Sequence, residues 1–458
     1  MFVADSTRYF LTFAALTCGT ALLTAAPADA TRWVRTGVNS TGIYRIGYDT
    51  LREMGFESPE RVTVFGRGGA MLPMEFTDEN GLPIMDNTLP QCDVYHTGDA
   101  LLFYAQGPDT YVWNPDSRAF RNAGKNIYSA YAWYFLTDTA QPAVMQPDVT
   151  TSASHTVTEG MDFVWHENDL MHNLLNAGQL FWGETVTDSP TGRLTWSPSL
   201  PDLLPGRTGV MECVTYSNKG EKGVLTYGIT GGSDVTFHTL SYASNYWTPQ
   251  APVVGEVIMP QTGQTPEVFV QYTSETEESP LWLDYWTLTY PCSVPSLLDA
   301  DGNSLPQKSI TLTDVTAGES VSFMVPHLQE VMAFDVSDPA HTRLLDVTAD
   351  DDGCRVTMTA LCDAPRVLVM NPALEQPSPE APVSETVDMS VHRVQELAAE
   401  GADLLIITVP SLRDHAEMLA ETHRRLQNLK VAVVTIGELY NEFSAGMPDP
   451  MAYRSAGR

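Results

Sequence analysis

The sequence predicts a mainly β fold, made of a small β-rich domain and a β-sandwich, followed by the beginning of an α/β domain. Short apolar runs separated by Gly, Pro, Ser and Asn recur up to about residue 363, with the spacing of antiparallel strands. After residue 400 an apolar run, a stretch with helical periodicity and a second apolar run follow one another, which indicates strand, helix and strand. Residue 400 therefore marks a change of architecture.

Composition bounds the size of the protein and excludes one class of partner. The 458 residues are 43% hydrophobic, enough for roughly two to four domains with ordinary cores. The formal net charge is −32, and phosphate contacts need Lys and Arg clusters that this sequence lacks. We therefore expect no nucleic-acid partner, and we predict no cofactor.

Residues 1–30 are typical of a secretory signal peptide. Residues 10–26 are apolar and rich in small side chains, and Ala28-Asp29-Ala30 fits the A-x-A cleavage pattern. After the signal, no run reaches the ~18 apolar residues that a transmembrane helix needs. We therefore expect an exported protein without a transmembrane segment after the signal, located in the periplasm, at the outer-membrane surface or outside the cell.

Residues 31–147 form the predicted N-terminal β-rich domain. Polar and apolar residues alternate at 33–47 around a Ser-Thr-Gly turn, and a short helix is expected at 48–54. Further apolar runs, most of them bounded by Gly or Pro, predict strands within 61–73, 98–108 and 130–137.

Residues 148–365 form the predicted β-sandwich. Its candidate strands carry the strings GVMECVTYS, GVLTYGIT, DVTFHTL, EVFVQYT, LWLDYWTLTY, SITLTDV, SVSFMV, MAFDVS and CRVTMTAL. Trp282, Tyr285 and Trp286 are expected to fill the core. An exposed carbohydrate-binding platform is the alternative interpretation of these three aromatic residues.

Residues 366–400 are interpreted as a linker and a short helix. Residues 371–387 are rich in Pro, Glu and Ser and lack periodicity, which indicates a linker or an extended strap. The helix is expected at 391–400.

The segment 401–458 is the predicted start of the α/β domain. Residues 403–409 are a continuous apolar run, as a strand buried on both faces requires, and residues 412–426 have the periodicity of an amphipathic crossover helix. The apolar run at 430–435 completes a βαβ unit with parallel strands. Because one such unit cannot cover both faces of its sheet, we expect apolar surface to stay open unless the unit docks on the β domains.

The cysteines offer no arrangement suited to nucleophilic catalysis, which needs a thiolate supported by a neighbouring His. Removal of Cys18 with the signal leaves five of the six Cys, so at least one thiol stays unpaired in an exported protein. Cys354 and Cys362 could form a disulfide, although their spacing alone does not decide this. Cys92 and His96 are the one close Cys–His pair, and nothing around them matches a catalytic motif.

No metal site is predicted either. His166, Glu167 and His172 miss the H-E-x-x-H pattern, because the second His comes six residues after the first. The acidic residues within 346–352 miss the ligand spacing of an EF-hand. We expect a solvated acidic turn there.

The C-terminal string KVAVVTIGELYNEFSAGMPDPMAYR resembles the start of the catalytic domain of the gingipain family of cysteine peptidases. The strings GIYRIGYDTLREMGF, VTVFGRGGAMLP, HTGDALLFYAQGP and HENDLMHNLLNAGQLFWGE are similar to the type IX secretion sortases, a group within that family from Bacteroidetes-type bacteria. The resemblance to the sortases runs over most of the chain.

This resemblance implies a caspase-like α/β peptidase domain whose His and Cys dyad lies downstream of the PDP motif. Because the sequence ends in SAGR shortly after that motif, we interpret the chain as the N-terminal portion of a truncated or frameshifted product, without peptidase activity of its own. We assign no catalytic, cofactor-binding or metal-binding residue. Asp449, within the PDP motif, is expected to cap the next helix.

For a full-length relative, the resemblance implies a cysteine endopeptidase and transpeptidase that cleaves C-terminal signals from secreted cargo and attaches the cargo to a surface lipopolysaccharide. Cargo proteins and outer-membrane components of the secretion machine are the implied partners. A non-catalytic envelope protein that binds or scaffolds through its β domains is the alternative hypothesis.

Overall fold

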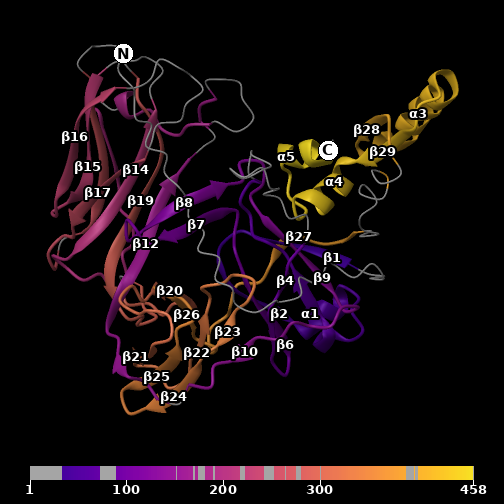
Figure 1. Ribbon diagram of the computed structural model, residues 1–458. Helices are drawn as coiled ribbons and strands as arrows, with labels where there is room; N and C mark the ends of the chain where they lie inside the picture. Colours follow the sequence, from indigo (N-terminus) through magenta and orange to yellow (C-terminus); the bar gives the residue numbers. More distant parts are fainter. Residues whose placement is uncertain are drawn as a thin grey trace.

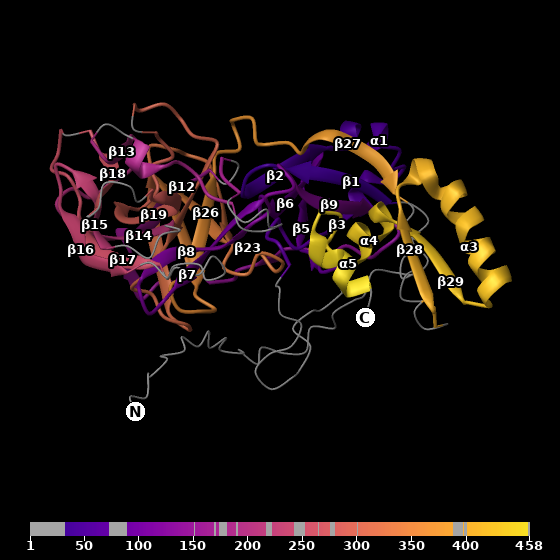
Figure 2. The same cartoon turned by 90° about the horizontal axis from the view of Figure 1, so that it is seen from above.

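The computed structural model describes residues 33–72, 89–150, 152–168, 171–173, 181–188, 191–216, 222–241, 252–263, 265–274, 280–299, 301–387, 397 and 401–456. The predicted signal peptide at 1–30 and almost all of the helix predicted at 391–400 lie outside these residues. No helix among the described residues combines the length and the apolar character needed to cross a membrane. Two perpendicular views place the N-terminal β domain between a larger set of sheets and the C-terminal α/β segment (Figures 1 and 2).

The N-terminal domain contains two sheets, with the strand orders β27-β1-β9-β3-β4, where β27 is Glu380–Val387, and β2-β6-β5. The short helix predicted at 48–54 is confirmed as α1. The elements that belong to this part of the sequence are β1 Trp33–Val38, β2 Gly42–Gly47, α1 Tyr48–Glu53, the 3-10 helix η1 Pro59–Arg61, β3 Thr63–Phe65, β4 Gln91–Cys92, β5 Val94–His96, β6 Ala100–Ala105 and β9 Ala132–Thr137.

The first two strands of this domain do not pair with each other, although only a short turn joins them. β1 pairs with β27 and β9, whereas β2 pairs with β6 in the second sheet. Buried side chains from both sheets, among them Val34, Phe103 and Leu136, form one core. The alternating pattern therefore predicts the strands correctly without indicating their partners.

A larger two-layer region contains most of the remaining strands. Its nine-stranded sheet has the order β10-β23-β22-β26-β20-β12-β19-β14-β17, and two four-stranded sheets have the orders β11-β21-β25-β24 and β13-β18-β15-β16. One apolar core includes side chains from the nine-stranded sheet, such as Met211 and Leu288, and from both smaller sheets, such as Tyr227 and Phe323. The nine-stranded sheet therefore faces both smaller sheets.

All nine strands predicted from strings in this region are present. The elements are β10 Gln146–Pro147, β11 His155–Thr156, β12 Glu159–Glu167, the 3-10 helix η2 Val186–Asp188, β13 Arg193–Trp196, β14 Thr208–Tyr216, β15 Lys222–Thr230, β16 Asp234–Ser241, β17 Val253–Ile258, β18 Glu267–Ser274, β19 Trp282–Ser293, β20 Gln307–Thr311, β21 Ser320–Pro326, β22 Met332–Asp335, β23 Arg343–Leu344, β24 Asp346–Asp350, β25 Gly353–Thr359 and β26 Arg366–Met370.

The three aromatic residues of β19 are buried. Trp286 is 1% exposed, Trp282 7% and Tyr285 9%, and Tyr285 donates a hydrogen bond to Glu212 Oε1 at 2.7 Å. A stacking platform must present its ring faces to solvent. The core interpretation is confirmed, and the carbohydrate platform at these residues is excluded.

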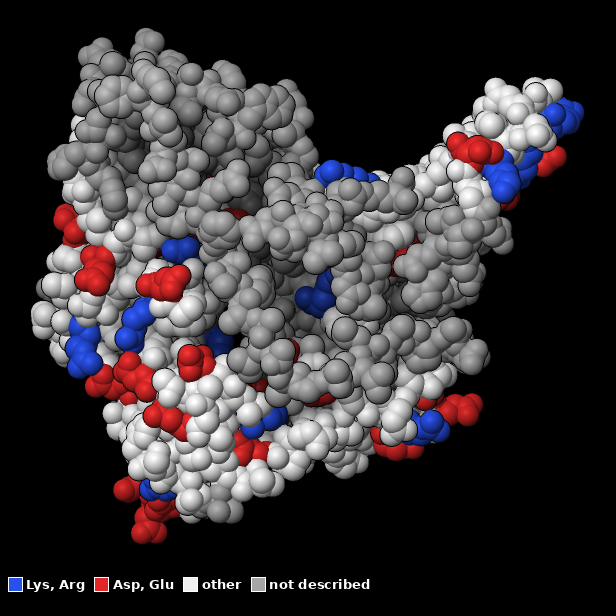
Figure 3. Space-filling view, viewed as in Figure 1, with Lys and Arg blue, Asp and Glu red and all other residues white. Residues whose placement is uncertain are grey.

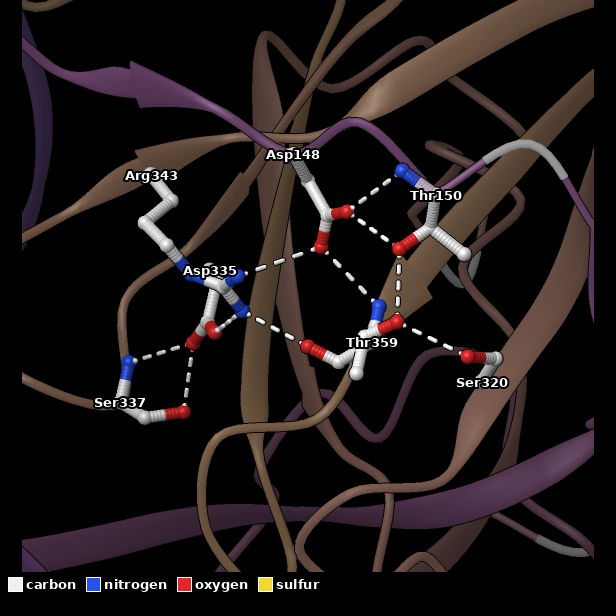
Figure 4. A network of polar contacts seen from close by, with 7 residues as sticks. All are labelled: Asp148, Thr150, Ser320, Asp335, Ser337, Arg343 and Thr359. Atoms are coloured by element: carbon white, nitrogen blue, oxygen red, sulfur yellow. Dashed lines mark hydrogen bonds and ion pairs between the residues drawn. The ribbon is translucent and has the colours of Figure 1, made fainter.

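A buried ion-pair network joins the nine-stranded sheet to a four-stranded sheet (Figure 4). Arg343 Nη1 lies 3.2 Å from Asp148 Oδ2, and Arg343 Nη2 lies 2.6 Å from Asp335 Oδ2. The same guanidinium donates to the carbonyl of Thr359 at 2.9 Å, and the Thr359 N–H donates to Asp148. Because both carboxylates are at most 5% exposed, each depends on these donors for its solvation.

A hairpin from the N-terminal part of the sequence lies on the nine-stranded sheet. Its strands are β7 Asp109–Asn114 and β8 Ala119–Lys125. The Phe120 N–H donates to Thr289 Oγ1 at 2.8 Å, and Thr287 Oγ1 donates to the Phe120 carbonyl at 3.1 Å. The hairpin therefore links the two β regions.

The predicted linker at 366–400 begins too early. Arg366–Met370 is β26, which pairs with β20 and β22 inside the nine-stranded sheet. Glu380–Val387 is β27, which pairs antiparallel with β1 at the edge of the N-terminal sheet. Of the alternatives predicted for 371–387, the extended strap fits residues 380–387, which form a strand that returns the chain to the first domain.

The predicted βαβ unit is confirmed. Its elements are β28 Leu404–Thr408, the 3-10 helix η3 Pro410–Leu412, α3 Arg413–Gln427 and β29 Val431–Thr435, and the two strands are parallel. Two further helices follow, α4 Ile436–Phe443 and α5 Pro450–Ala456. A capping box between Thr435 and Glu438 starts α4.

Burial of this unit differs from the prediction. β28 is only partly buried, and Ile407 is 37% exposed, so the expectation of a strand buried on both faces is wrong. The sheet nevertheless has cover on both sides. Ile406 and Val433 pack against α3, whereas Leu405 and Val434 pack with residues of α4 and α5. The two later helices supply the cover that one crossover helix cannot.

Candidate functional site

The described cysteines are structural thiols. Cys92, Cys213, Cys292 and Cys354 are buried, Cys362 is partly buried, and all five are free, so the possible Cys354–Cys362 disulfide is not formed. Burial raises the pKa of each thiol, in the case of Cys92 to about 12. A nucleophile needs a thiolate, and these environments favour the protonated form.

Cys92 and His96 do not form a catalytic pair. They lie on strands of different sheets, β4 and β5. The Cys92 thiol donates to the Gly66 carbonyl at 3.5 Å. His96 Nε2 is 3.0 Å from the Val62 carbonyl, and Nδ1 is 3.0 Å from the Tyr48 hydroxyl. Both ring nitrogens are therefore engaged away from the thiol.

The His residues considered for metal binding contact other side chains. His166 lies in β12 and contacts Glu184 Oε1 at 3.0 Å, whereas His172 Nε2 contacts Thr185 Oγ1 at 3.2 Å. The acidic run at 346–352 occupies the β24–β25 hairpin, where residues 348–352 are exposed. This confirms the solvated turn. Within the described ranges, no group of three or more His, Cys, Asp or Glu side chains could hold a metal ion.

The most strongly organised feature of the α/β segment is residues 444–451, here called the docking segment. It connects α4 to α5 and lies against the N-terminal domain. Ser444, Ala445, Met447 and Asp449 are each at most 1% exposed. Met447 belongs to the core that β1, β6 and β9 share, and Ala445 packs with aromatic residues of the same domain.

Asp449 is the polar centre of this contact. Its Oδ1 accepts the Met451 N–H at 2.8 Å, so it caps α5 as predicted. Its Oδ2 accepts the Leu72 N–H at 2.7 Å, across 377 residues of sequence. Burial raises the pKa of this carboxyl, although both N–H donors act in the opposite direction.

Two more contacts fix the docking segment. Arg35 Nη1 donates to the Gly446 carbonyl at 3.3 Å, and its guanidinium lies over the Trp133 ring. Asn126 Nδ2 donates to the Pro448 carbonyl at 3.2 Å. Gly446 has φ +83°, and a Cβ there would lie 2.9 Å from the Phe135 ring. The close approach therefore requires glycine.

The contacts of the docking segment position the α/β segment and do not form a catalytic site. Burial raises the pKa of the described thiols, and the docking segment offers backbone caps instead of a nucleophile and base. What it does is hold the first strands of the α/β segment in a fixed orientation on the β domain. The PDP motif could be recognised in the sequence, but its partners Leu72 and Asn126 have no local signal, nor does Arg35, the partner of Gly446.

Residues 397–458 match the family model of peptidase family C25, the gingipain family. This match confirms the resemblance to the gingipain family that the C-terminal string indicated. It covers the segment that contains the βαβ unit and the docking segment. No curated protein matches the sequence.

Among solved structures, dimeric latent PorU from Porphyromonas gingivalis matches with a TM-score of 0.71 and 23% identity. The match covers 94% of this chain and 39% of the PorU chain, so the chain spans well under half the length of PorU. The likeness establishes the fold. A family two carbohydrate esterase from Cellvibrio japonicus, at 14% identity over 30% of this chain and 36% of that one, has a TM-score of 0.13, too low to support an argument.

Proposed function

We propose that these residues are the N-terminal part of a gingipain-like cysteine peptidase of the type IX secretion sortase kind, which processes the C-terminal signals of secreted cargo. Two findings on the same chain support this proposal. The α/β segment matches peptidase family C25, and the β domains that precede it have the fold of latent PorU. Export to the periplasm or outer-membrane surface, and contact with cargo and the secretion machine, belong to the same proposal.

The β domains then act as a platform for the peptidase domain. Cysteine acyl transfer requires a thiolate, a base and backbone donors held in fixed geometry. The described thiols lack the first of these, so we propose that the 458 residues by themselves do not cleave peptides. Their contribution is to place β28, β29 and the helices after them through the docking segment.

A cleavage assay tests the absence of activity. The purified 458-residue chain is incubated with a peptide that carries the C-terminal signal of a secreted protein, with and without prior thiol alkylation. We expect no turnover in either sample. Turnover that alkylation abolishes would contradict the proposal, because it would require a reactive thiol.

The intact mass of the protein in its native envelope tests the assignment as part of a peptidase. A mass well above 50.3 kDa, together with alkylation-sensitive cleavage by that material, supports the proposal. A mass at or below 50.3 kDa without cleavage supports the alternative, a non-catalytic envelope protein that binds or scaffolds.

A further inference from the structure

A cleft of about 580 Å³ lies where the N-terminal domain, the β7–β8 hairpin and the nine-stranded sheet meet. This volume is within the range of ligand sites, which often form at domain interfaces. The cleft is built from the turn after β1, the β7–β8 hairpin, β12, β20 and the loops after β22 and β25. None of these elements belongs to the segment 397–458, so the cleft lies outside the part of the chain that matches the peptidase family.

One wall of the cleft is a row of aromatic rings. Phe120 and Phe163 stack with centroids 4.0 Å apart. The row continues from Phe163 to Trp165 at 5.5 Å and from Trp165 to Tyr111 at 4.7 Å. Trp165 is 43% exposed, so the row ends in a ring open to solvent. Aromatic residues two apart in β7 and in β12 share a strand face, which is the signal in the sequence that could have indicated this wall.

The inner end of the row already holds a cation. The Arg366 guanidinium lies 4.8 Å from the Phe120 centroid and 5.2 Å from the Phe163 centroid. It also donates to Ser309 Oγ at 2.6 Å and to Asp162 Oδ1 at 3.4 Å. Arg366 is thus fully engaged and shows that these ring faces accept positive charge.

The remaining charge of the lining is negative. Asp162 is paired with Arg366, the one Lys or Arg among the lining residues, all of which belong to the described part of the chain. Asp109 and Asp363 are the carboxylates that no cation of the lining pairs. Ring faces add negative potential of their own. A cationic ligand therefore fits the lining better than an anion does.

Asp109 lies beside the open end of the aromatic row. It shares a face of β7 with Tyr111. Its Oδ1 is buried and accepts no hydrogen bond from any described residue, with Lys125 Nζ 4.0 Å away. Asp109 thus provides a carboxylate oxygen that forms an ion pair with Lys125 but accepts no hydrogen bond from the described residues.

We propose that this cleft binds a lysine or arginine side chain presented by a basic segment of a partner protein. The charged group lies near Asp109, and the aliphatic stem covers Trp165 and Tyr111. A protein partner is favoured over a small molecule because Val112 and Trp165, on the rim, are both more than 40% exposed. Exposed apolar side chains next to polar groups, with aromatic residues among them, are typical of protein contact sites.

The test uses two peptides that differ only in charge. Ligand-observed NMR titration of the whole purified chain compares acetyl-Gly-Ser-Lys-Gly-Ser-amide with the same peptide carrying acetyl-lysine. We expect millimolar binding of the lysine peptide and at least about tenfold weaker binding of the neutral one. Trp165→Ala should lower the affinity for the lysine peptide by about 5- to 30-fold, the range for loss of one cation–π contact. Trp165→Phe should retain most of the affinity.

Matched variants separate the cleft from the general acidity of the protein. Asp109→Asn should weaken binding, whereas Asp350→Asn, on the exposed β24–β25 hairpin, and Tyr128→Ala, an exposed aromatic residue outside the cleft, should leave it unchanged. Equal binding of the charged and neutral peptides, an unaltered affinity in Trp165→Ala, or no binding of the lysine peptide at millimolar concentration would each overturn the proposal. Binding of maltose that depends on Trp165, without binding of the lysine peptide, would replace it with a carbohydrate site.

Discussion

The docking segment and the βαβ unit are neighbours in the sequence, yet they relate to the rest of the molecule in opposite ways. In the docking segment, Met447 and Asp449 are completely buried against the N-terminal domain. On α3 of the βαβ unit, Met418 and Leu426 are each 71% exposed. The βαβ unit projects away from the β domains, and Lys, Arg, Asp and Glu side chains lie on this projection (Figures 1 and 3). The anchoring therefore resides in a short connection rather than in the regular elements.

This difference has a physical cause. α3 covers its sheet with small residues, Ala416 and Ala420, so its larger apolar side chains point elsewhere. The docking segment instead presents backbone groups that need partners, and the N-terminal domain supplies them. Directional hydrogen bonds to buried groups specify one orientation, whereas exposed apolar side chains specify none.

The largest effect is expected from Asp449→Ala. Removal of the carboxylate leaves the buried Leu72 and Met451 N–H groups without acceptors, at a cost of about 2–4 kcal/mol in the local opening free energy of the docked helices. Hydrogen exchange of the α4 and α5 amides measures this. Asp449→Asn keeps one acceptor oxygen and should show a smaller change. Unaltered exchange in the alanine variant would mean that apolar packing alone holds the segment.

Gly446→Ala should weaken docking by about 1–3 kcal/mol, because it combines a left-handed φ with a clash against the Phe135 ring. The matched control is Gly437→Ala in α4, where an added Cβ meets nothing within 4 Å and should stabilise the helix by about 0.5–1 kcal/mol. The same exchange measurement compares both variants. A similar change in the two would remove the distinction between a docked and an open position.

The contribution of Asp449 should also depend on pH. Burial holds the pKa of this carboxyl above its ordinary value of 3.8. As pH rises past 3.8, the unfolded state releases a proton that the native state retains, so the stabilising contribution is complete below that pH and declines through the folded-state pKa. Each pKa unit of elevation corresponds to about 1.4 kcal/mol. The stability of the parent relative to Asp449→Asn should therefore fall from pH 3.8 upward, as denaturant titrations at several pH values would detect. A pH-independent difference would contradict this.

The smallest effect is expected on the outer face of α3. Met418→Ser and Leu419→Ser should change the opening free energy of β28 and β29 by less than about 0.5 kcal/mol, since both side chains are at least half exposed. Ala420→Leu, at a completely buried position, should cost about 1–3 kcal/mol. Amide exchange in β29 reports on all three. A large loss in either serine variant would reveal that this face is covered.

Local patterns in the sequence determined the elements. The alternation at 33–47 and the apolar strings of the sandwich predicted strands that are present, and the helical spacing after residue 412 predicted α3. The PDP motif predicted the cap of α5. These signals succeed because they involve residues two to four apart, whose relative direction is set by the backbone.

The partners of these elements were decided only by the tertiary structure. β27 returns to pair with β1, the hairpin of β7 and β8 crosses to the nine-stranded sheet, and Asp449 meets Leu72. The same holds for the cleft, where rings from β7, β8 and β12 align. An apolar or aromatic residue predicts that its side chain will be buried or stacked, but it does not predict the surface against which that side chain packs. The packing partner depends on how the faces of whole sheets and helices fit together. When the two partners lie hundreds of residues apart, no local sequence pattern indicates that they will meet.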